Sequence, residues 1–431
     1  MKTRNFASLK SSEVMKILHT ADWHLGNTFH GHDRTAEHRH FLNFLTDTLR
    51  IRQPDALFVA GDVFDSSNPS AAAEELFYDF LKRATEEVPG LQVVVTAGNH
   101  DSAGRIEAPA SLLKLHNIYV RGTLRHDEQG EPDFGHYVLP LSRRTDREAV
   151  CVCLALPYLR PADYPAGMSA AEGLRYWFDG LSRNLAHSNF SGLPVVACAH
   201  YYAAGASVEA EEHSERLVVG GQDCVPADVS GKSVAYTALG HIHRMQQVES
   251  GRNVWYAGSA LPMSFSERHY RHGVLWTELD EESGEVSVER IAYEPLCRLL
   301  SIPSKGAATP SEVLDELSAL PRREKNDDGS RWPYIEIKVE ERQPEPSLMH
   351  DVAVLLEEKA ARFCRMVRVI PGAETARTDT ESPDTLRRLS PMEMAHRVFD
   401  ARYHSPMPPE LEERFSIAVG ALAAEETERG E

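Results

Sequence analysis

Five short fragments carry most of the residues that could do chemistry, and each of them follows an apolar run. The fragments are Asp22-Trp23-His24, Gly61-Asp62, Gly98-Asn99-His100-Asp101, Ala199-His200 and Gly240-His241-Ile242-His243. Carboxylate, amide and imidazole groups bind divalent metal ions, and alternate residues of an extended chain point to the same side. His241 and His243 can therefore serve adjacent ions. The pattern predicts two neighbouring divalent ions that share a carboxylate, an arrangement used to hydrolyse phosphoesters.

Strands that end at these fragments would have to position them. The sequence predicts strands over 15–20, 56–60 and 93–97, separated by helices over 34–52 and 71–87. This alternation indicates an α/β domain, in which functional residues gather at the carboxyl ends of the strands. The next part of the chain is richer in strands. Further strands are expected over 151–156, 195–199, 234–239, 254–257, 273–278 and 285–293, with one helix over 170–186.

The composition changes after Pro295, where a small accessory domain is expected. Helices over 311–320 and 352–362 alternate there with strands over 334–339 and 366–370. Two further helices follow, and the apolar stripe of the second can pack within this chain or against a partner. The predicted division is a disordered extension at 1–14, a catalytic domain at 15–294, the accessory domain at 295–371, a linker at 372–389, a helical segment at 390–424 and a tail at 425–431.

Length and charge narrow the class of protein. The chain has 431 residues and a net charge of −19, so we expect more than one domain. Such an acidic chain does not grip nucleic acid over its whole surface, although nucleic acid can still be its substrate. No apolar run approaches the roughly 18 residues of a membrane span. The six cysteines form no CxxC pair, which favours reduced thiols in a cytoplasmic protein without membrane contact.

Taken in order, the five fragments resemble the metal motifs of the calcineurin-like metallophosphoesterases over about residues 17–243. Longer stretches are similar to nuclease subunits of the SbcD type, the bacterial counterparts of the double-strand-break repair nucleases of archaea and eukaryotes. These stretches are His19-Thr20-Ala21-Asp22-Trp23-His24-Leu25-Gly26, Ala60-Gly61-Asp62-Val63-Phe64-Asp65, Leu156-Pro157-Tyr158-Leu159-Arg160-Pro161, Ala238-Leu239-Gly240-His241-Ile242-His243 and Ser264-Phe265-Ser266-Glu267.

The resemblance implies an α/β fold with a four-layer αββα core, a small capping domain and C-terminal helices that dock on the coiled coil of an SbcC-type, SMC-like ATPase. It implies a metal-dependent DNA nuclease for DNA repair, recombination and replication. The activity would be a 3′–5′ exonuclease on double strands and an endonuclease on single strands and hairpins. Double-stranded DNA ends and hairpins would be the substrates, and a homodimer within a heterotetramer would be the assembly.

The resemblance also assigns roles to individual residues. Metal 1 would be held by Asp22, His24, Asp62 and His243, and metal 2 by Asp62, Asn99, His200 and His241. His100 would be the catalytic histidine, and Asp101 would orient it through the other ring nitrogen. Two Mn²⁺ ions are implied by the resemblance, since these ligands suit zinc or iron equally well. Asp65 departs from archaeal members, some of which carry a histidine there.

Other charged or ligating residues have less specific interpretations. Arg105, Arg160 and Arg244 are candidates for contact with DNA phosphates, together with Arg268 and Arg271, although half or more of these could be ordinary surface charges. His30, His32, His38 and His40 have the composition of a metal-binding tract. They flank an amphipathic helix, however, where solvated histidines are the simpler interpretation.

Two alternatives compete with the nuclease. The first is a phosphodiesterase or phosphatase of the same superfamily that acts on a small molecule or a protein. Protein phosphatases of the superfamily continue Gly-Asp with Asp-Arg-Gly and have Gly-Asn-His-Glu, whereas this chain has Asp65-Ser66 and Gly98-Asn99-His100-Asp101. The second is a scaffold with a decayed site, which the presence of every expected ligand disfavours.

Overall fold

The structure is a computed structural model that describes residues 14–207, 224–248, 253–340, 345 and 347–369, with a few single residues between 392 and 415. The described residues up to Val339 and from 347 to Val367 belong to one compact unit. The predicted extension and the helical segment 390–424 lie almost entirely outside the described residues. None of the described helices is both long and apolar enough to cross a membrane.

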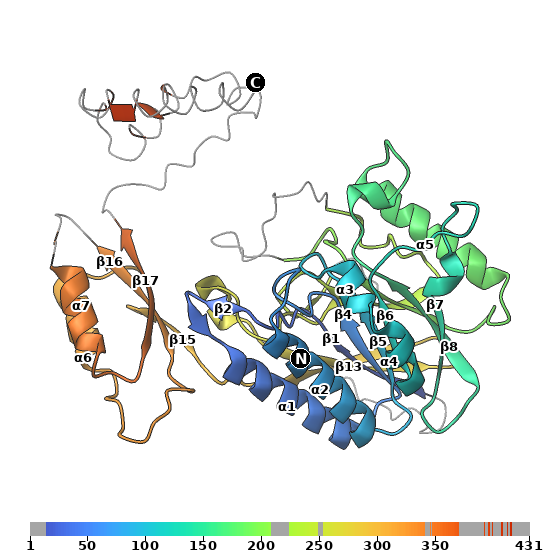
Figure 1. Ribbon diagram of the computed structural model, residues 1–431, viewed down its shortest axis with the longest axis horizontal. Helices are drawn as coiled ribbons and strands as arrows, with labels where there is room; N and C mark the ends of the chain where they lie inside the picture. The colour runs from blue at the N-terminus through green and yellow to red at the C-terminus, as the bar shows by residue number, and fades with distance from the viewer. Residues whose placement is uncertain are drawn as a thin grey trace, which may run out of the picture. The chain divides into compact units, whose positions relative to one another are not determined.

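The first of two six-stranded sheets has the order β14-β13-β1-β4-β5-β6 (Figure 1). Strands β1, β4, β5 and β6 are parallel to one another, and β13 and β14 are added antiparallel. Helices α1 and α2 cover its outer face, where Phe41 and Phe77 pack around Trp23. The bounds are β1 Val14–Thr20, α1 Thr35–Arg52, β4 Ala56–Ala60, α2 Ala71–Glu87, β5 Gln92–Thr96, β6 Ile118–Arg121, β13 Gly273–Asp280 and β14 Val286–Ala292.

The second six-stranded sheet has the order β11-β12-β10-β9-β8-β7. Helix α5 (Ala170–Ala186) covers its outer face and begins at a capping box formed by Ser169 and Glu172. Its Trp177 and Phe178 are buried against the sheet. The strands are β7 Val138–Ser142, β8 Ala149–Leu156, β9 Val195–His200, β10 Val234–Gly240, β11 Gln246–Gln247 and β12 Val254–Tyr256.

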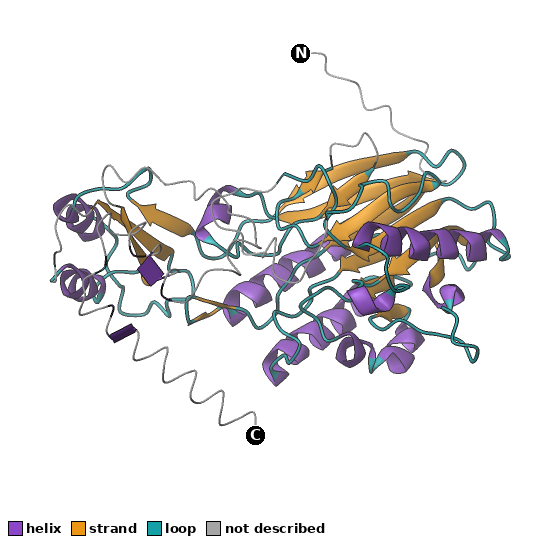
Figure 2. Ribbon diagram, turned by 90° about the horizontal axis from the view of Figure 1, so that it is seen from above, coloured by secondary structure: helices purple, strands orange, loops and turns teal. Residues whose placement is uncertain are grey.

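The two sheets pack face to face, which confirms the expected four-layer αββα core. Ile17 and Phe58 of the first sheet share a buried cluster with Cys153 and Cys198 of the second. Figure 2 shows the strands as adjacent layers with helices outside them. Shorter elements join these layers: β2 Thr28–Phe29, β3 His32–Asp33, α3 Ala103–Glu107, α4 Ala110–Leu113, and the 3-10 helices η1 Lys114–His116, η2 Phe134–Tyr137, η3 Pro161–Asp163 and η4 Phe265–His269.

A separate three-stranded sheet follows the core in sequence. It consists of β15 (Leu299–Ile302), β16 (Tyr334–Glu340) and β17 (Arg362–Val369). Helices α6 (Pro310–Ser318) and α7 (Leu348–Leu356) pack on it. The structure has both predicted strands and both predicted helices of this region with shifted bounds, and it adds β15, which was not predicted. The boundaries of the accessory domain stay a prediction.

The predicted helix over 352–362 is wrong at both ends, because α7 begins at Leu348 and ends at Leu356. Residues 357–362 have a composition that favours a helix, but hydrogen bonds to distant residues hold their backbone in another conformation. The amide of Arg323 donates to the carbonyl of Glu358, and the amide of Ala360 donates to Pro321. The buried Lys359 ammonium donates to the carbonyl of Leu320 at 2.9 Å.

Candidate metal centre

The five predicted fragments meet at one edge of the core. They follow β1, β4 and β5 in one sheet and end or follow β9 and β10 in the other. The loops are held in unusual backbone conformations, because Asp22, His24 and Asp62 have φ values of 51°, 48° and 49°. Left-handed conformations of this kind cost about 1 kcal/mol or more and need support from neighbouring structure. The amides of Asp22 and His24 supply it by donating to the carbonyls of Gly61 and Asp62, each at 3.0 Å.

Two glycines allow the sheets to approach closely at this edge. Gly61 has a φ of +84°, and a Cβ there would lie 2.2 Å from Nδ1 of His200. A Cβ at Gly240 would lie 1.9 Å from the carbonyl oxygen of Ala60. Any side chain at either position would push the ligand-bearing loops apart.

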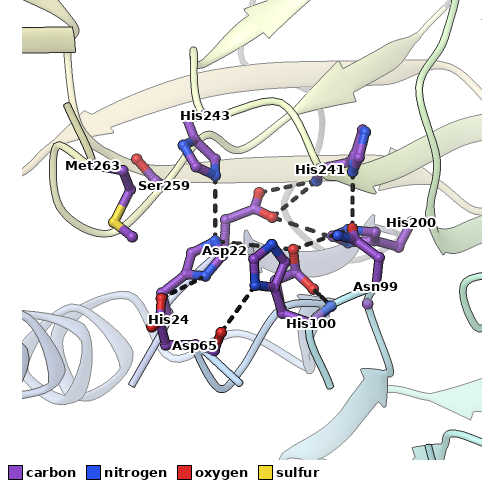
Figure 3. A network of polar contacts seen from close by, with 12 residues as sticks. Asp22, His24, Asp65, Asn99, His100, His200, His241, His243, Ser259 and Met263 are labelled. Carbon is purple, nitrogen blue, oxygen red and sulfur yellow. Dashed lines mark hydrogen bonds and ion pairs between the residues drawn. The ribbon is translucent and has the colours of Figure 1, made fainter. Parts of the chain in front are cut away.

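One half of the centre brings Asp22, His24 and His243 together, with ligating atoms within 4.8 Å of one another (Figure 3). Nε2 of His24 and Nε2 of His243 are only 3.3 Å apart. On the opposite side of each ring, Nδ1 faces a carboxylate, with Asp65 Oδ1 at 3.5 Å from His24 and Glu267 Oε1 at 3.1 Å from His243. Each carboxylate favours the proton on Nδ1, so two Nε2 lone pairs face each other as a cation would require.

The other half of the centre brings Asp22, Asp62 and His200 within the same 4.8 Å limit. Nδ1 of His200 lies 2.9 Å from the carbonyl of Ala60, which leaves its Nε2 facing the centre. The Asn99 amide oxygen lies 2.9 Å from this Nε2 and 3.0 Å from Nδ1 of His241. Asn99 and His241 are thereby brought to this half of the centre.

Asp62 lies where the two halves meet. Its Oδ1 accepts a hydrogen bond from the backbone amide of His100 at 2.8 Å. Its Oδ2 is buried, lies 3.3 Å from Nε2 of His200 and 3.9 Å from Nε2 of His24, and accepts no hydrogen bond from any described residue. A buried carboxylate oxygen that accepts no hydrogen bond is a suitable ligand for a cation, because an uncompensated buried charge costs several kcal/mol.

The two buried carboxylates have opposite pKa shifts. Burial raises the pKa of Asp22 to about 6, although the nearby histidines oppose the shift. Burial also acts to raise the pKa of Asp62, but His200, His24 and His100 outweigh it and lower the value. Burial acts to lower the pKa of His200, but Asp62 raises the pKa of His200 to about 10, so a protonated His200 can balance this carboxylate, and a divalent cation would replace that proton when it binds. The donor set fits metal ions on these grounds.

His100 lies beside the ligands, with its ring centroid 4.9 Å from that of His24. Its Nδ1 lies 2.9 Å from the backbone carbonyl of Asp65, which orients the ring. His100 is half-buried, whereas Asp62, His24 and His243 are buried. This exposure suits a residue that acts on a substrate.

The interpretation that Asp101 orients His100 is wrong. The buried Asp101 carboxylate accepts hydrogen bonds from three backbone amides, those of Gly98 at 2.8 Å, Phe64 at 2.9 Å and Val63 at 3.2 Å. Asp101 therefore ties the loop that carries Asp62 to the loop that carries Asn99. The carbonyl of Asp65 takes the role predicted for Asp101.

Three of the five candidate DNA-contacting arginines differ in their surroundings. Arg105 is exposed on α3. The Arg160 guanidinium lies 5.5 Å from the ring centroid of Tyr158, whose ring is itself 6.1 Å from that of His200. Arg244 lies over Tyr270 at 5.8 Å and donates to Ser207 at 3.0 Å. Contact with DNA stays a prediction for all three.

The four histidines at 30–40 do not gather into a metal site among the described residues. His32 Nε2 lies 2.9 Å from the carbonyl of Phe363, and His40 Nδ1 lies 2.8 Å from the hydroxyl of Tyr293. His38 is buried, and burial lowers its pKa to about 3. Simple solvation is therefore also wrong for His38.

Glu267 was missed as a site residue because it lies far from His243 in sequence. Glu267 Oε1 fixes the His243 ring, while Glu267 Oε2 accepts from the amide of Met263 at 2.8 Å. Metal-binding histidines usually donate their second ring N–H to a carboxylate, a carbonyl or water. A carboxylate that follows the predicted ligands in the chain is therefore the feature that could have indicated Glu267.

Comparison with known proteins agrees with this geometry. Residues 15–245 match the model of the calcineurin-like phosphoesterases, and residues 295–403 match that of the type 5 capsule protein repressor C-terminal domain. The D subunit of the nuclease SbcCD from Rhodobacter capsulatus is 37% identical over 88% of this chain and 92% of its own length. The D subunits of the same nuclease from Escherichia coli K12 and Bacillus subtilis 168 are 33% and 35% identical, each over 63% of this chain and 67% of their own length.

Proposed function

The chain belongs to the calcineurin-like phosphoesterases and, within them, to the D subunits of the SbcCD nucleases, and we propose that it hydrolyses DNA phosphodiesters with two metal ions. The observation that carries this proposal is the meeting of five loops from two sheets, which gathers carboxylates and imidazoles into groups of three whose ligating atoms lie within 4.8 Å of one another. Double-stranded ends and hairpins are the proposed substrates. This substrate, together with the free cysteines, supports a cytoplasmic location.

The proposed ligands are divided between the two halves of the centre. Asp22, His24 and His243 would hold one ion, Asn99, His200 and His241 would hold the other, and Asp62 would bridge both. When bound, such ions polarise a phosphoryl oxygen and lower the pKa of a water molecule. We take both ions to be Mn²⁺, on the basis of the family to which the chain belongs.

The residues of the chain have distinct parts in the reaction. The loops hold the ligands in place, because Asp101 ties the loop of Asp62 to the loop of Asn99. His100 would contact the scissile phosphate and donate a proton from Nε2 to the leaving oxygen. Its Nδ1 faces the carbonyl of Asp65, a partner that can only accept, so the ring is held by donation from Nδ1.

A nuclease assay on linear duplex DNA tests the proposal. We expect degradation that requires added Mn²⁺, proceeds from the 3′ ends and increases when an SbcC-type ATPase and ATP are present. A hairpin substrate should be opened under the same conditions. Hydrolysis of phosphoproteins or small phosphomonoesters, without any cleavage of DNA, would overturn the assignment.

We propose that residues 390–424 bind the ATPase. Deletion of residues 385–431 is expected to abolish co-purification with the ATPase and to leave Mn²⁺-dependent cleavage of single strands unchanged, since every proposed ligand precedes the deletion. Removal of residues 425–431 alone is the control and should leave the complex intact. Tight association of the larger deletion variant with the ATPase would place the partner surface elsewhere.

We also propose that the protein forms a homodimer within a heterotetramer, through a groove of about 620 Å³ between α2 and the segment 113–118. Tyr78 and Leu81 line this groove on α2. Leu115, which lines the groove, is 79% exposed, and Leu112 just before it in sequence is 68% exposed, so both add apolar surface at this place.

Leu115→Glu is expected to convert the dimer to a monomer, because the dimer would have to bury the new charge. Sedimentation equilibrium or light scattering measures the change. Ile51→Glu is the matched control, since Ile51 is 70% exposed on α1 and does not line the groove. A Leu115→Glu protein that remains dimeric would contradict this interface.

A further inference from the structure

Arg34 is a fully buried arginine immediately before α1. Its Nε and Nη2 donate to the two carboxylate oxygens of Glu37 at 3.0 and 3.1 Å. Its Nη1 donates to the carbonyl of Pro262 at 2.8 Å and lies 3.5 Å from Oδ1 of Asn27. The guanidinium is therefore held on several sides, and it cannot shift without disturbing its partners.

One side of this ion pair reaches the three-stranded sheet. The hydroxyl of Tyr334, on β16, donates to Oε1 of Glu37 at 2.7 Å. Two guanidinium groups lie over the Tyr334 ring, with Arg34 at 5.8 Å and Arg362 of β17 at 5.0 Å from its centroid. Tyr334 is fully buried, so the hydroxyl bond is protected from water.

A first path leads from Arg34 to His100 and His24. Asn27 donates from Nδ2 to Oδ1 of Asp65 at 2.9 Å. The same Oδ1 lies 3.5 Å from Nδ1 of His24. The carbonyl of Asp65 lies 2.9 Å from Nδ1 of His100 and orients that ring.

A second path leads from Arg34 to His243. Arg34 holds the carbonyl of Pro262, and the next residue, Met263, donates its amide to Oε2 of Glu267 at 2.8 Å. The other oxygen of Glu267 lies 3.1 Å from Nδ1 of His243. The two paths end on different loops of the centre.

We propose that Arg34 and Glu37 are positioning residues that couple the three-stranded sheet to the metal centre. A displacement of the sheet would move Tyr334, shift the ion pair and alter the orientation of His100 and His243. Burying an ion pair is costly, and fixing one arrangement of neighbouring elements is the best-supported reason for keeping one. This inference rests on the proposed function and adds a route by which events at the sheet set the hydrolytic rate.

The test uses Tyr334→Phe, which removes only the hydroxyl that bonds to Glu37. The substrate is bis(p-nitrophenyl) phosphate with Mn²⁺, because this small diester is too short to need the sheet for binding. We expect kcat to fall by about 10-fold, the scale of one hydrogen bond to a charged group, with KM changed less than twofold. Tyr137→Phe is the matched control, since Tyr137 in η2 has a buried hydroxyl that donates to the carbonyl of Thr123 and accepts from the amide of Arg125.

Asn27→Ala interrupts the first path on the side of the metal centre and completes a double-mutant cycle. If the path is continuous, the fold-reduction in kcat of the double variant Tyr334→Phe/Asn27→Ala is smaller than the product of the fold-reductions of the two single variants. Tyr137→Phe should combine multiplicatively with Asn27→Ala. Asn27→Ala also tests the path on its own should Tyr334→Phe not fold, with the same expected loss of kcat.

Wild-type kcat in both single variants, or strictly multiplicative losses in the cycle, would overturn the coupling. If the wild-type protein does not hydrolyse the diester with Mn²⁺, the proposed function is overturned instead. Thermal melting of each variant separates these results from unfolding. Equal melting temperatures of Tyr334→Phe and Tyr137→Phe, with only the first impaired in kcat, support positioning over a general loss of stability.

Discussion

Replacement of Asp62 with alanine is expected to remove both metal ions and to lower the rate of DNA cleavage by about 10³- to 10⁴-fold or more. Asp62 is the residue proposed to contact both ions, and its Oδ2 is buried without a hydrogen bond from the described residues. Several kcal/mol of transition-state stabilisation depend on the ions, and each 1.36 kcal/mol corresponds to about tenfold in rate. Metal content per chain and the cleavage rate at saturating Mn²⁺ are the measurements.

Asp55→Ala is the matched control for this variant. Asp55 is also a buried carboxylate, but it lies just before β4, at the end opposite to Asp62. It accepts from the amides of Lys16 at 2.9 Å and Arg144 at 3.0 Å. Asp55→Ala should lower stability and leave two ions bound. Two ions in Asp62→Ala would show that Asp62 does not bridge them.

Replacement of His100 with alanine is expected to leave metal binding intact and to reduce kcat by about 10²- to 10⁴-fold, the usual contribution of a general acid. The contact between His100 and Asp62 Oδ1 is made by the backbone amide, which alanine retains. The arrangement of the ligands should therefore survive the substitution. Metal titration and single-turnover cleavage of a duplex end measure the two effects separately.

His126→Ala controls for the loss of an imidazole, since His126 is exposed and belongs neither to the proposed ligands nor to the lining of the proposed dimer groove. It should have wild-type activity. A His100→Ala protein that has lost an ion would make His100 a ligand, in agreement with its position within 4.8 Å of ligating atoms of His24 and Asp62.

The core was predictable because local signals and tertiary structure agree there. β1, β4 and β10 are apolar runs that stop at a ligand-bearing loop, and burial of both sheet faces requires such runs. Helix α5 was predicted with its observed bounds, and in the structure the capping box of Ser169 and Glu172 fixes its start locally. The convergence of the fragments followed from their position at the ends of parallel strands.

The errors arose where long-range contacts decide the structure. Asp101 adjoins His100 in sequence, yet its carboxylate is taken up by amides of Val63 and Phe64 from another loop. Glu267 and Tyr334 act on residues far away in the chain, and no local pattern indicates their partners. The end of α7 depends on bonds to Pro321 and Arg323, which helix propensity does not include.

Anomalous diffraction from crystals grown with Mn²⁺ is the direct test of a two-metal centre bridged by Asp62. We expect two anomalous peaks roughly 3.5 to 4 Å apart, with the Asp62 carboxylate contacting both. Asp22, His24 and His243 should surround one peak, and Asn99, His200 and His241 the other. A single peak, or two peaks that do not share Asp62, would contradict the two-metal centre.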